Sequence, residues 1–147
     1  MKIYKLTTVT EPIVKAFDVL IPQLAPDCAV PRKKELEALA NSDHTSVFIA
    51  EEDQDILGTL TLVWNKIPTG DKIWIEDVVV DKAARGKGIG KALIQFAVAY
   101  VKEHHGTSIN LTSSPERIAA NQLYQNLGFA KRETNVYRLN MKKDYRI

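Results

Sequence analysis

Hydrophobic and polar positions divide this 147-residue chain into segments with two different periods. The most informative stretch is residues 72–100. Its first part, residues 73–80, is an apolar, valine-rich run interrupted only by the carboxylates Glu76 and Asp77. From Ile89 onward the apolar residues recur every three or four positions, which is typical of an amphipathic helix. This stretch therefore predicts a strand, a short connector and a long helix.

The residues before this stretch predict two helices and an antiparallel meander. In chain order we expect a strand over residues 1–9, a helix from Thr10, a helix over residues 32–41, and strands over residues 45–51, 56–64 and 73–80. Thr10 suits a helix N-cap and Pro12 the first turn, whereas Pro22 should kink or end the helix. Short polar turns between the last three strands favour antiparallel pairing.

The residues after the long helix predict a crossover and a closing hairpin. We expect a C-terminal cap at Gly106, a strand over residues 108–112, a helix from Ser114 to Gly128, hairpin strands over residues 129–132 and 135–141, and a charged tail over residues 142–147. The strand at 108–112 is reached through a helix, so it should run parallel to residues 73–80. Together the patterns predict an α/β (α+β) fold. It is a single domain over residues 1–147 in which a mixed, mostly antiparallel, twisted sheet of about six to seven strands is flanked by about four helices.

Composition narrows the possible partners. The chain has 20 basic and 18 acidic residues and a formal net charge of +2, which gives no argument for nucleic acid or a membrane surface. One cysteine, Cys28, excludes an intramolecular disulfide and a Cys-based zinc site, and the three histidines lack metal-ligand spacing. There is no N-terminal signal and no apolar run of about 18 residues. We expect a cytoplasmic protein that binds no metal.

The glycine-rich segment Arg85-Gly86-Lys87-Gly88-Ile89-Gly90-Lys91 lies where strand gives way to helix. A helix start carries unpaired backbone N–H groups, and glycines let a ligand approach them, so the segment predicts a pyrophosphate site. It is not a P-loop, because Arg85 and Ala92 occupy positions that need glycine and Ser/Thr. It is not a dinucleotide fingerprint either, since the glycines follow G-x-G-x-G. An ordinary tight turn is the remaining alternative.

Two motifs resemble those of one enzyme family. Arg85-x-x-Gly88-x-Gly90 resembles the coenzyme A-binding motif of the GNAT family of N-acetyltransferases, and Asn121–Phe129 resembles the segment that closes the acetyl-CoA site in that family. The two motifs occur in the right order with a predicted strand between them. The resemblance is close over residues 56–141 and extends to the N-terminal elements in layout only. It implies the GNAT fold, with acetyl-CoA as co-substrate.

The resemblance also implies roles for individual residues. Tyr124 would donate a proton or hydrogen bond to the departing sulfur of coenzyme A, because a phenol is protonated at neutral pH; the alternative is a packed core tyrosine. Asn121, three residues earlier, would bind the pantetheine or phosphate region, with a capping or packing role as the alternative. The implied cofactor-binding residues are Val78, Val79, Val80, Arg85, Gly86, Lys87, Gly88, Ile89, Gly90, Lys91, Asn121 and Tyr124, the valines acting through their main chain.

Glu76 is the candidate general base. Strand alternation puts Trp74, Glu76 and Val78 on one face and Asp77 on the other, unless a bulge shifts the register. A carboxylate in a half-buried strand should have a raised pKa and could take a proton from an ammonium substrate. The alternatives are an ion pair that only orients the amine, or a structural bridge.

These observations predict an acetyl-CoA-dependent N-acetyltransferase. It would transfer the acetyl group directly to a primary amine of a small molecule such as an amino sugar, a polyamine or an amino-acid-like compound, without Cys28 as a nucleophile. A protein or peptide amine is the first alternative acceptor, and a non-catalytic coenzyme A-binding module is the second. A homodimer is possible. The acceptor should be selected by residues 17–41, 64–71 and 135–138.

Overall fold

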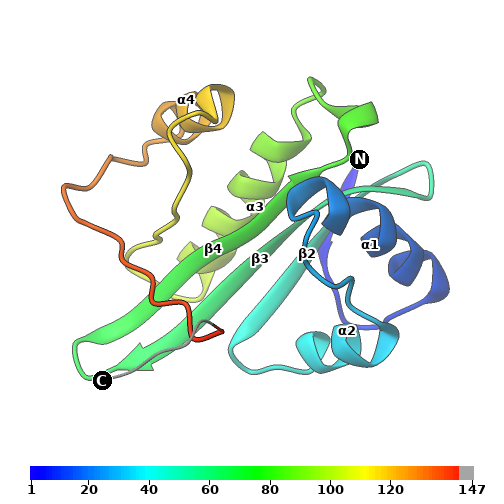
Figure 1. Ribbon diagram of the computed structural model, residues 1–147, viewed down its shortest axis with the longest axis horizontal. Helices are drawn as coiled ribbons and strands as arrows, with labels where there is room; N and C mark the ends of the chain where they lie inside the picture. Colours follow the sequence, from blue (N-terminus) through cyan, green and yellow to red (C-terminus); the bar gives the residue numbers. More distant parts are fainter. Residues whose placement is uncertain (143–147) are drawn as a thin grey trace. The chain divides into compact units, whose positions relative to one another are not determined.

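The computed structural model describes residues 1–142 and divides the chain into two compact units that meet at residues 112 and 113. The first unit contains β1 (Lys2–Lys5), α1 (Glu11–Leu24), α2 (Lys33–Ala40), β2 (Thr45–Glu52), β3 (Asp55–Ile67), β4 (Gly70–Val80), the short 3-10 helix η1 (Lys82–Ala84) and α3 (Ile89–Glu103) (Figure 1). The second contains α4 (Ile118–Asn126). The expected tail lies, from residue 143 on, outside the described residues, and the single-domain organisation stays a prediction.

The predicted antiparallel meander is confirmed. The sheet has the strand order β1-β2-β3-β4, and every neighbouring pair is antiparallel. Its apolar side chains alternate between two faces. Val47 and Ile49 of β2 pack with residues of α1 and α2, among them Phe17 and Leu36. On the other face the ring of Phe48 packs edge-on against that of Phe96 in α3, with 5.0 Å between the ring centroids. The sheet therefore separates α1 and α2 from α3 (Figure 1).

The α/β class is as predicted, but the sheet has four strands among the described residues rather than six to seven. Residues 108–112 contribute one parallel bridge, between Trp74 and Asn110, instead of a strand. The predicted direction is right, but the ladder does not extend. The Asn110 side-chain amide also donates to the carbonyl of Ile73, at 3.4 Å, and such side-chain hydrogen bonds compete with a regular ladder.

The prediction of a closing hairpin is also wrong. Residues 129–132 and 135–140 contain no strand in the structure. Side chains expected to pack there are exposed; Tyr137 retains 86% of its accessible surface and Val136 retains 77%. Strand pairing must offset the entropy of ordering the chain, and apolar burial, which would normally supply that free energy, is absent in this segment.

Helix boundaries differ from the expectations at several places. The first helix continues through Pro22, and the Thr10 side chain makes no capping hydrogen bond. α3 ends at Glu103, three residues before Gly106. α4 begins at Ile118, not at Ser114, because the Ser114 carbonyl accepts hydrogen bonds from the Arg117 backbone N–H and the Asn121 side chain. The predicted stop at Gly128 is confirmed, since its φ of 98° places it in the left-handed region.

Candidate functional site

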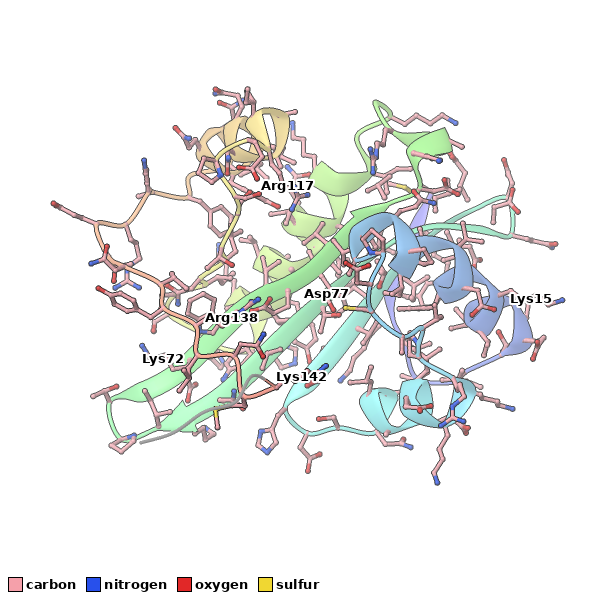
Figure 2. The ribbon with its side chains drawn as sticks, in the orientation of Figure 1. Lys15, Lys72, Asp77, Arg117, Arg138 and Lys142 are labelled. Carbon is pink, nitrogen blue, oxygen red and sulfur yellow. The ribbon has the colours of Figure 1, made fainter. Side chains whose placement is uncertain are left out.

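A β-bulge in β4 shapes the region around Glu76. Glu76 pairs with Thr61, whereas Val79 pairs with Thr59, so β4 has one extra residue between these pairs. Asp77, labelled in Figure 2, lies at the bulge with a φ of 50°. Directly paired residues share a face of the sheet, so Val79 and not Val78 lies on the same face as Glu76. The alternation predicted for Trp74 and Glu76 holds up to the bulge. The prediction that Val78 lies on the same face is wrong, because the bulge shifts the register.

The bulge also sets the direction of the main chain. The Asp81 N–H donates to the Leu57 carbonyl at 2.8 Å, so the neighbouring pair of Gly58 and Val80 is a non-hydrogen-bonded pair. Alternation along the strand then directs the backbone groups of Val79 toward β3. Those of Val78 and Val80 point the opposite way, to the outer edge of β4.

That edge has no β-strand beside Val78 and Val80 in the first unit. The Asn110 backbone hydrogen-bonds to that of Ile73 and Ile75, each at 2.9 Å, before β4 reaches the bulge. The main chain of Val78 and Val80 is therefore not used by the β3–β4 ladder, and its contact with a cofactor stays a prediction. Contact of Val79 with a cofactor stays a prediction, because its main-chain groups face the ladder and its side chain is buried.

The glycine-rich loop follows directly. Asp81 caps η1 by accepting from the Ala83 N–H at 3.1 Å. Gly86 and Gly88 have φ values of 83° and 80°, and a Cβ atom at either would meet no other atom within 4 Å. Glycine is therefore required by the backbone conformation and not by crowding, and the loop borders open space.

The loop ends in unpaired amides. The first helical hydrogen bond of α3 joins the Ala92 N–H to the Gly88 carbonyl, at 3.0 Å. The amides of Ile89, Gly90 and Lys91 accordingly have no acceptor within the helix. The Arg85, Lys87 and Lys91 side chains are exposed around them, and the Arg85 Nε donates to the Val80 carbonyl at 3.4 Å. Converging N–H groups and cations beside open space fit a pyrophosphate.

Glu76 has the electrostatics expected of a base. Partial burial raises the pKa of its carboxyl, and repulsion from Asp77 raises it further. No hydrogen bond or ion pair joins its carboxylate to another residue among positions 1–142. The structure therefore gives no support to a purely structural bridge at this position.

The second unit holds the other predicted residues, Asn121 and Tyr124, on α4. Tyr124 is 7% exposed, and its ring meets that of Phe129 edge-on at 6.1 Å. Burial raises the pKa of the Tyr124 phenol, and the charge of Arg117 partly opposes this. The Asn121 side chain donates to the Ser114 carbonyl at 3.0 Å and so joins α4 to the turn before it; binding of the cofactor by Asn121 stays a prediction.

Sequence reasoning missed Gln23, whose amide reaches the connector after β4. Gln23 follows Pro22 in the last turn of α1, and no motif marks it. Within residues 1–142 no cluster of three or more His, Cys, Asp or Glu side chains has a geometry that could hold a metal. No helix in the same part of the chain combines the length and hydropathy needed to cross a bilayer.

Comparison with known proteins identifies the family. Streptothricin acetyltransferase of Escherichia coli is 30% identical over 102 residues, which are 67% of this chain and 56% of that protein. The matched part of the chain covers only 18% to 56% of the length of the curated relatives.

Solved structures show the same fold. An aminoglycoside acetyltransferase from an uncultured soil metagenomic sample, solved with sisomicin, has a TM-score of 0.82 at 21% identity over 95% of both chains. An AAC(6')-Iy complex with the bisubstrate analogue CoA-S-monomethyl-acetylneamine has a TM-score of 0.75 at 21% identity, covering 95% of this chain and 97% of that one. The model of the acetyltransferase (GNAT) family matches residues 13–129, and the chain belongs to this family.

Proposed function

We propose that the protein is an acetyl-CoA-dependent N-acetyltransferase that acts on a primary amine of a small molecule. The observation that carries the proposal is the continuity of one polar surface in the first unit. Outward backbone groups of Val78 and Val80 lead directly into the unpaired amides at the start of α3. This surface offers amide-binding groups followed by a pyrophosphate site, the order in which these groups occur along coenzyme A.

Different residues would bind the pyrophosphate and the pantetheine of coenzyme A. The amides of Ile89, Gly90 and Lys91 would hold the pyrophosphate, and Arg85 and Lys87 would add positive charge. The main chain of Val78 and Val80 would pair with the pantetheine amides. Acetyl-CoA, when bound, supplies an acyl group that is activated as a thioester.

The transfer needs two proton movements. The amine nitrogen forms a bond to the acyl carbon as the carbon–sulfur bond breaks. The Glu76 carboxylate would accept the proton that the amine loses, directly or through water, and its raised pKa suits this role. The Tyr124 hydroxyl would donate a proton to the leaving sulfur, and burial keeps it protonated at neutral pH.

The acceptor class is supported by relatives. One relative is named streptothricin acetyltransferase, and the soil aminoglycoside acetyltransferase was solved with sisomicin. The carboxylates of Glu76 and Asp77, which both keep access to solvent although Glu76 is partly desolvated, would attract a cationic amine. A peptide amine remains the alternative acceptor, and a non-catalytic coenzyme A-binding module remains the alternative function.

The test has two stages. Calorimetry measures binding of coenzyme A and acetyl-CoA, and a thiol assay then follows coenzyme A release with sisomicin, streptothricin, spermidine, glucosamine 6-phosphate and a short peptide. Turnover on one of the small amines is expected. Turnover only on the peptide would support the alternative acceptor, and binding without turnover would support the non-catalytic module. Absence of binding would overturn the proposal.

A further inference from the structure

One side chain of α1 reaches the connector that leads into the glycine-rich loop. Gln23 lies in the last turn of α1, and Asp81 and Lys82 lie just after β4, 58 and 59 positions later in the chain. All three residues belong to the first unit. The contact therefore joins two segments that are distant in sequence, immediately before the predicted pyrophosphate site.

The Gln23 amide contacts the connector with both of its ends. Its Oε1 accepts a hydrogen bond from the Lys82 backbone N–H at 2.9 Å. Its Nε2 lies 3.4 Å from the Asp81 Oδ1 and 3.2 Å from the Val19 carbonyl, and it can donate to both. The same Asp81 oxygen accepts from the Ala83 N–H at 3.1 Å, so one carboxylate links α1 to η1.

The start of the connector has other support as well. Asp81 donates its own N–H to Leu57 in β3, the Ala84 N–H donates to the Asp81 carbonyl at 2.8 Å, and Ala84 is buried. Beyond Ala84, residues 85–88 are exposed and contain two glycines with positive φ. Such a loop samples many conformations unless its entry is fixed, and ordering it on binding would weaken affinity. A restraint on residues 81–84 limits that cost before a ligand arrives.

We propose that Gln23 is a positioning residue that holds the phosphate-binding loop ready for coenzyme A by fixing Asp81 and Lys82. This inference rests on the proposed function of the loop. Gln23 acts through the connector and does not contact the reacting atoms. Loss of the hydrogen bonds from Gln23 to Asp81 and Lys82, which we call the Gln23 clamp, should therefore weaken coenzyme A binding. It should leave turnover at saturating acetyl-CoA nearly unchanged.

The chemistry of the clamp suggests a charge-swap test. A glutamine amide both donates to a carboxylate and accepts from an N–H group. In Q23M both hydrogen bonds to the connector, to Asp81 and to Lys82, are lost at similar side-chain length. In Q23E the acceptor for Lys82 is kept, but a second carboxylate faces Asp81. In Q23E/D81N the repulsion is removed, and the amide at position 81 can either donate to the new carboxylate or keep the cap on Ala83, because one Asp81 oxygen makes both contacts in the wild type.

The experiment measures coenzyme A binding by calorimetry for the wild type, these three variants and the control Q95M. Gln95 is exposed on α3 and takes no part in the Gln23 clamp, so Q95M makes the same chemical change at an unrelated surface position. We expect dissociation constants about tenfold higher for Q23M and Q23E, which corresponds to about 1.4 kcal/mol, and a wild-type value for Q95M. Q23E/D81N should bind more tightly than Q23E.

Hydrogen exchange gives a readout that does not require turnover. The Lys82 amide should exchange faster in Q23M than in wild type, while amides in the centre of the sheet keep their protection. Should Q23M fail to fold, the comparison of Q23E with Q23E/D81N tests the same contact. Wild-type affinity in Q23M, or no recovery in Q23E/D81N, overturns the inference. Absence of coenzyme A binding by the wild-type protein instead overturns the proposed function.

Discussion

Tyr124 combines a buried ring with a hydroxyl group whose pKa is raised by that burial. The ring packs edge-on against Phe129, and phenylalanine at position 124 would keep this packing. We predict that Tyr124→Phe lowers kcat by about 100-fold, in the range for loss of a general acid, while coenzyme A affinity is unchanged. Thiol release and calorimetry measure the two quantities. An unchanged kcat would assign Tyr124 to packing alone.

Glu76 and Asp77 are adjacent carboxylates with different roles in the proposal. Repulsion from Asp77 contributes to the raised pKa of Glu76, so Asp77→Asn should lower that pKa, although the larger effect of burial remains. A base works when deprotonated, so the acidic limb of the pH profile of kcat/KM should move to lower pH. Glu76→Gln should remove most activity at every pH. An acidic limb that stays in place in Asp77→Asn would exclude Glu76 as the titrating base.

At the scale of elements, Gly58 controls the approach of α3 to the sheet. A Cβ atom there would lie 3.0 Å from the Val79 carbonyl oxygen and 3.3 Å from Leu93 Cδ1. The backbone oxygen cannot move aside without shifting β4, so Gly58→Ala should destabilise the protein by about 1–3 kcal/mol. Urea denaturation measures this change. A free energy of unfolding equal to that of wild type would show that β4 relaxes at no cost.

The glycine-rich loop allows a matched pair of substitutions. Gly88 and Gly70 both have positive φ, and a Cβ atom at either would meet nothing within 4 Å. Alanine should therefore cost stability at both sites, about 1–2 kcal/mol at Gly88, whose φ is 80°, and more at Gly70, whose φ of 125° lies outside the left-handed well. Only Gly88→Ala places a methyl group beside the predicted pyrophosphate site, and it should weaken coenzyme A binding at least about tenfold. Calorimetry showing equal affinity in both variants would contradict a phosphate role for the loop.

Elements with a clear hydrophobic period were predictable from the sequence. The period of α3 and the alternation of Ile73 and Ile75 allowed β4 and α3 to be predicted. The bulge at Asp77 could not be predicted, because the consecutive valines after it carry no alternation that would reveal a shift in register. The hairpin over residues 129–141 was predicted wrongly, since apolar residues such as Val136 and Tyr137 suggested burial that the structure does not show.

At the scale of the whole molecule, some residues of the candidate site could be predicted from the sequence and others depend on the tertiary structure. Most of its residues lie within Glu76–Lys91, a short range in which one strand leads into one helix, so the sequence alone could outline them. Gln23 could not be found this way, because its hydrogen bonds depend on how α1 lies against the sheet. Tyr124 and Asn121 were identified only through the family resemblance, and their place in the second unit leaves their roles as predictions.

Ligand binding should also stabilise the folded chain. A ligand that binds only the native state at about 100 times its dissociation constant adds about 2.7 kcal/mol to the free energy of unfolding. We expect coenzyme A to do so in urea denaturation of the wild type and of Tyr124→Phe, because the proposed pyrophosphate amides lie in the first unit. Gly88→Ala should show a smaller gain at the same ligand concentration, since its affinity is reduced. An equal gain in Gly88→Ala would place the coenzyme A site elsewhere in the molecule, whereas loss of the gain in Tyr124→Phe would show that α4 provides much of the binding energy.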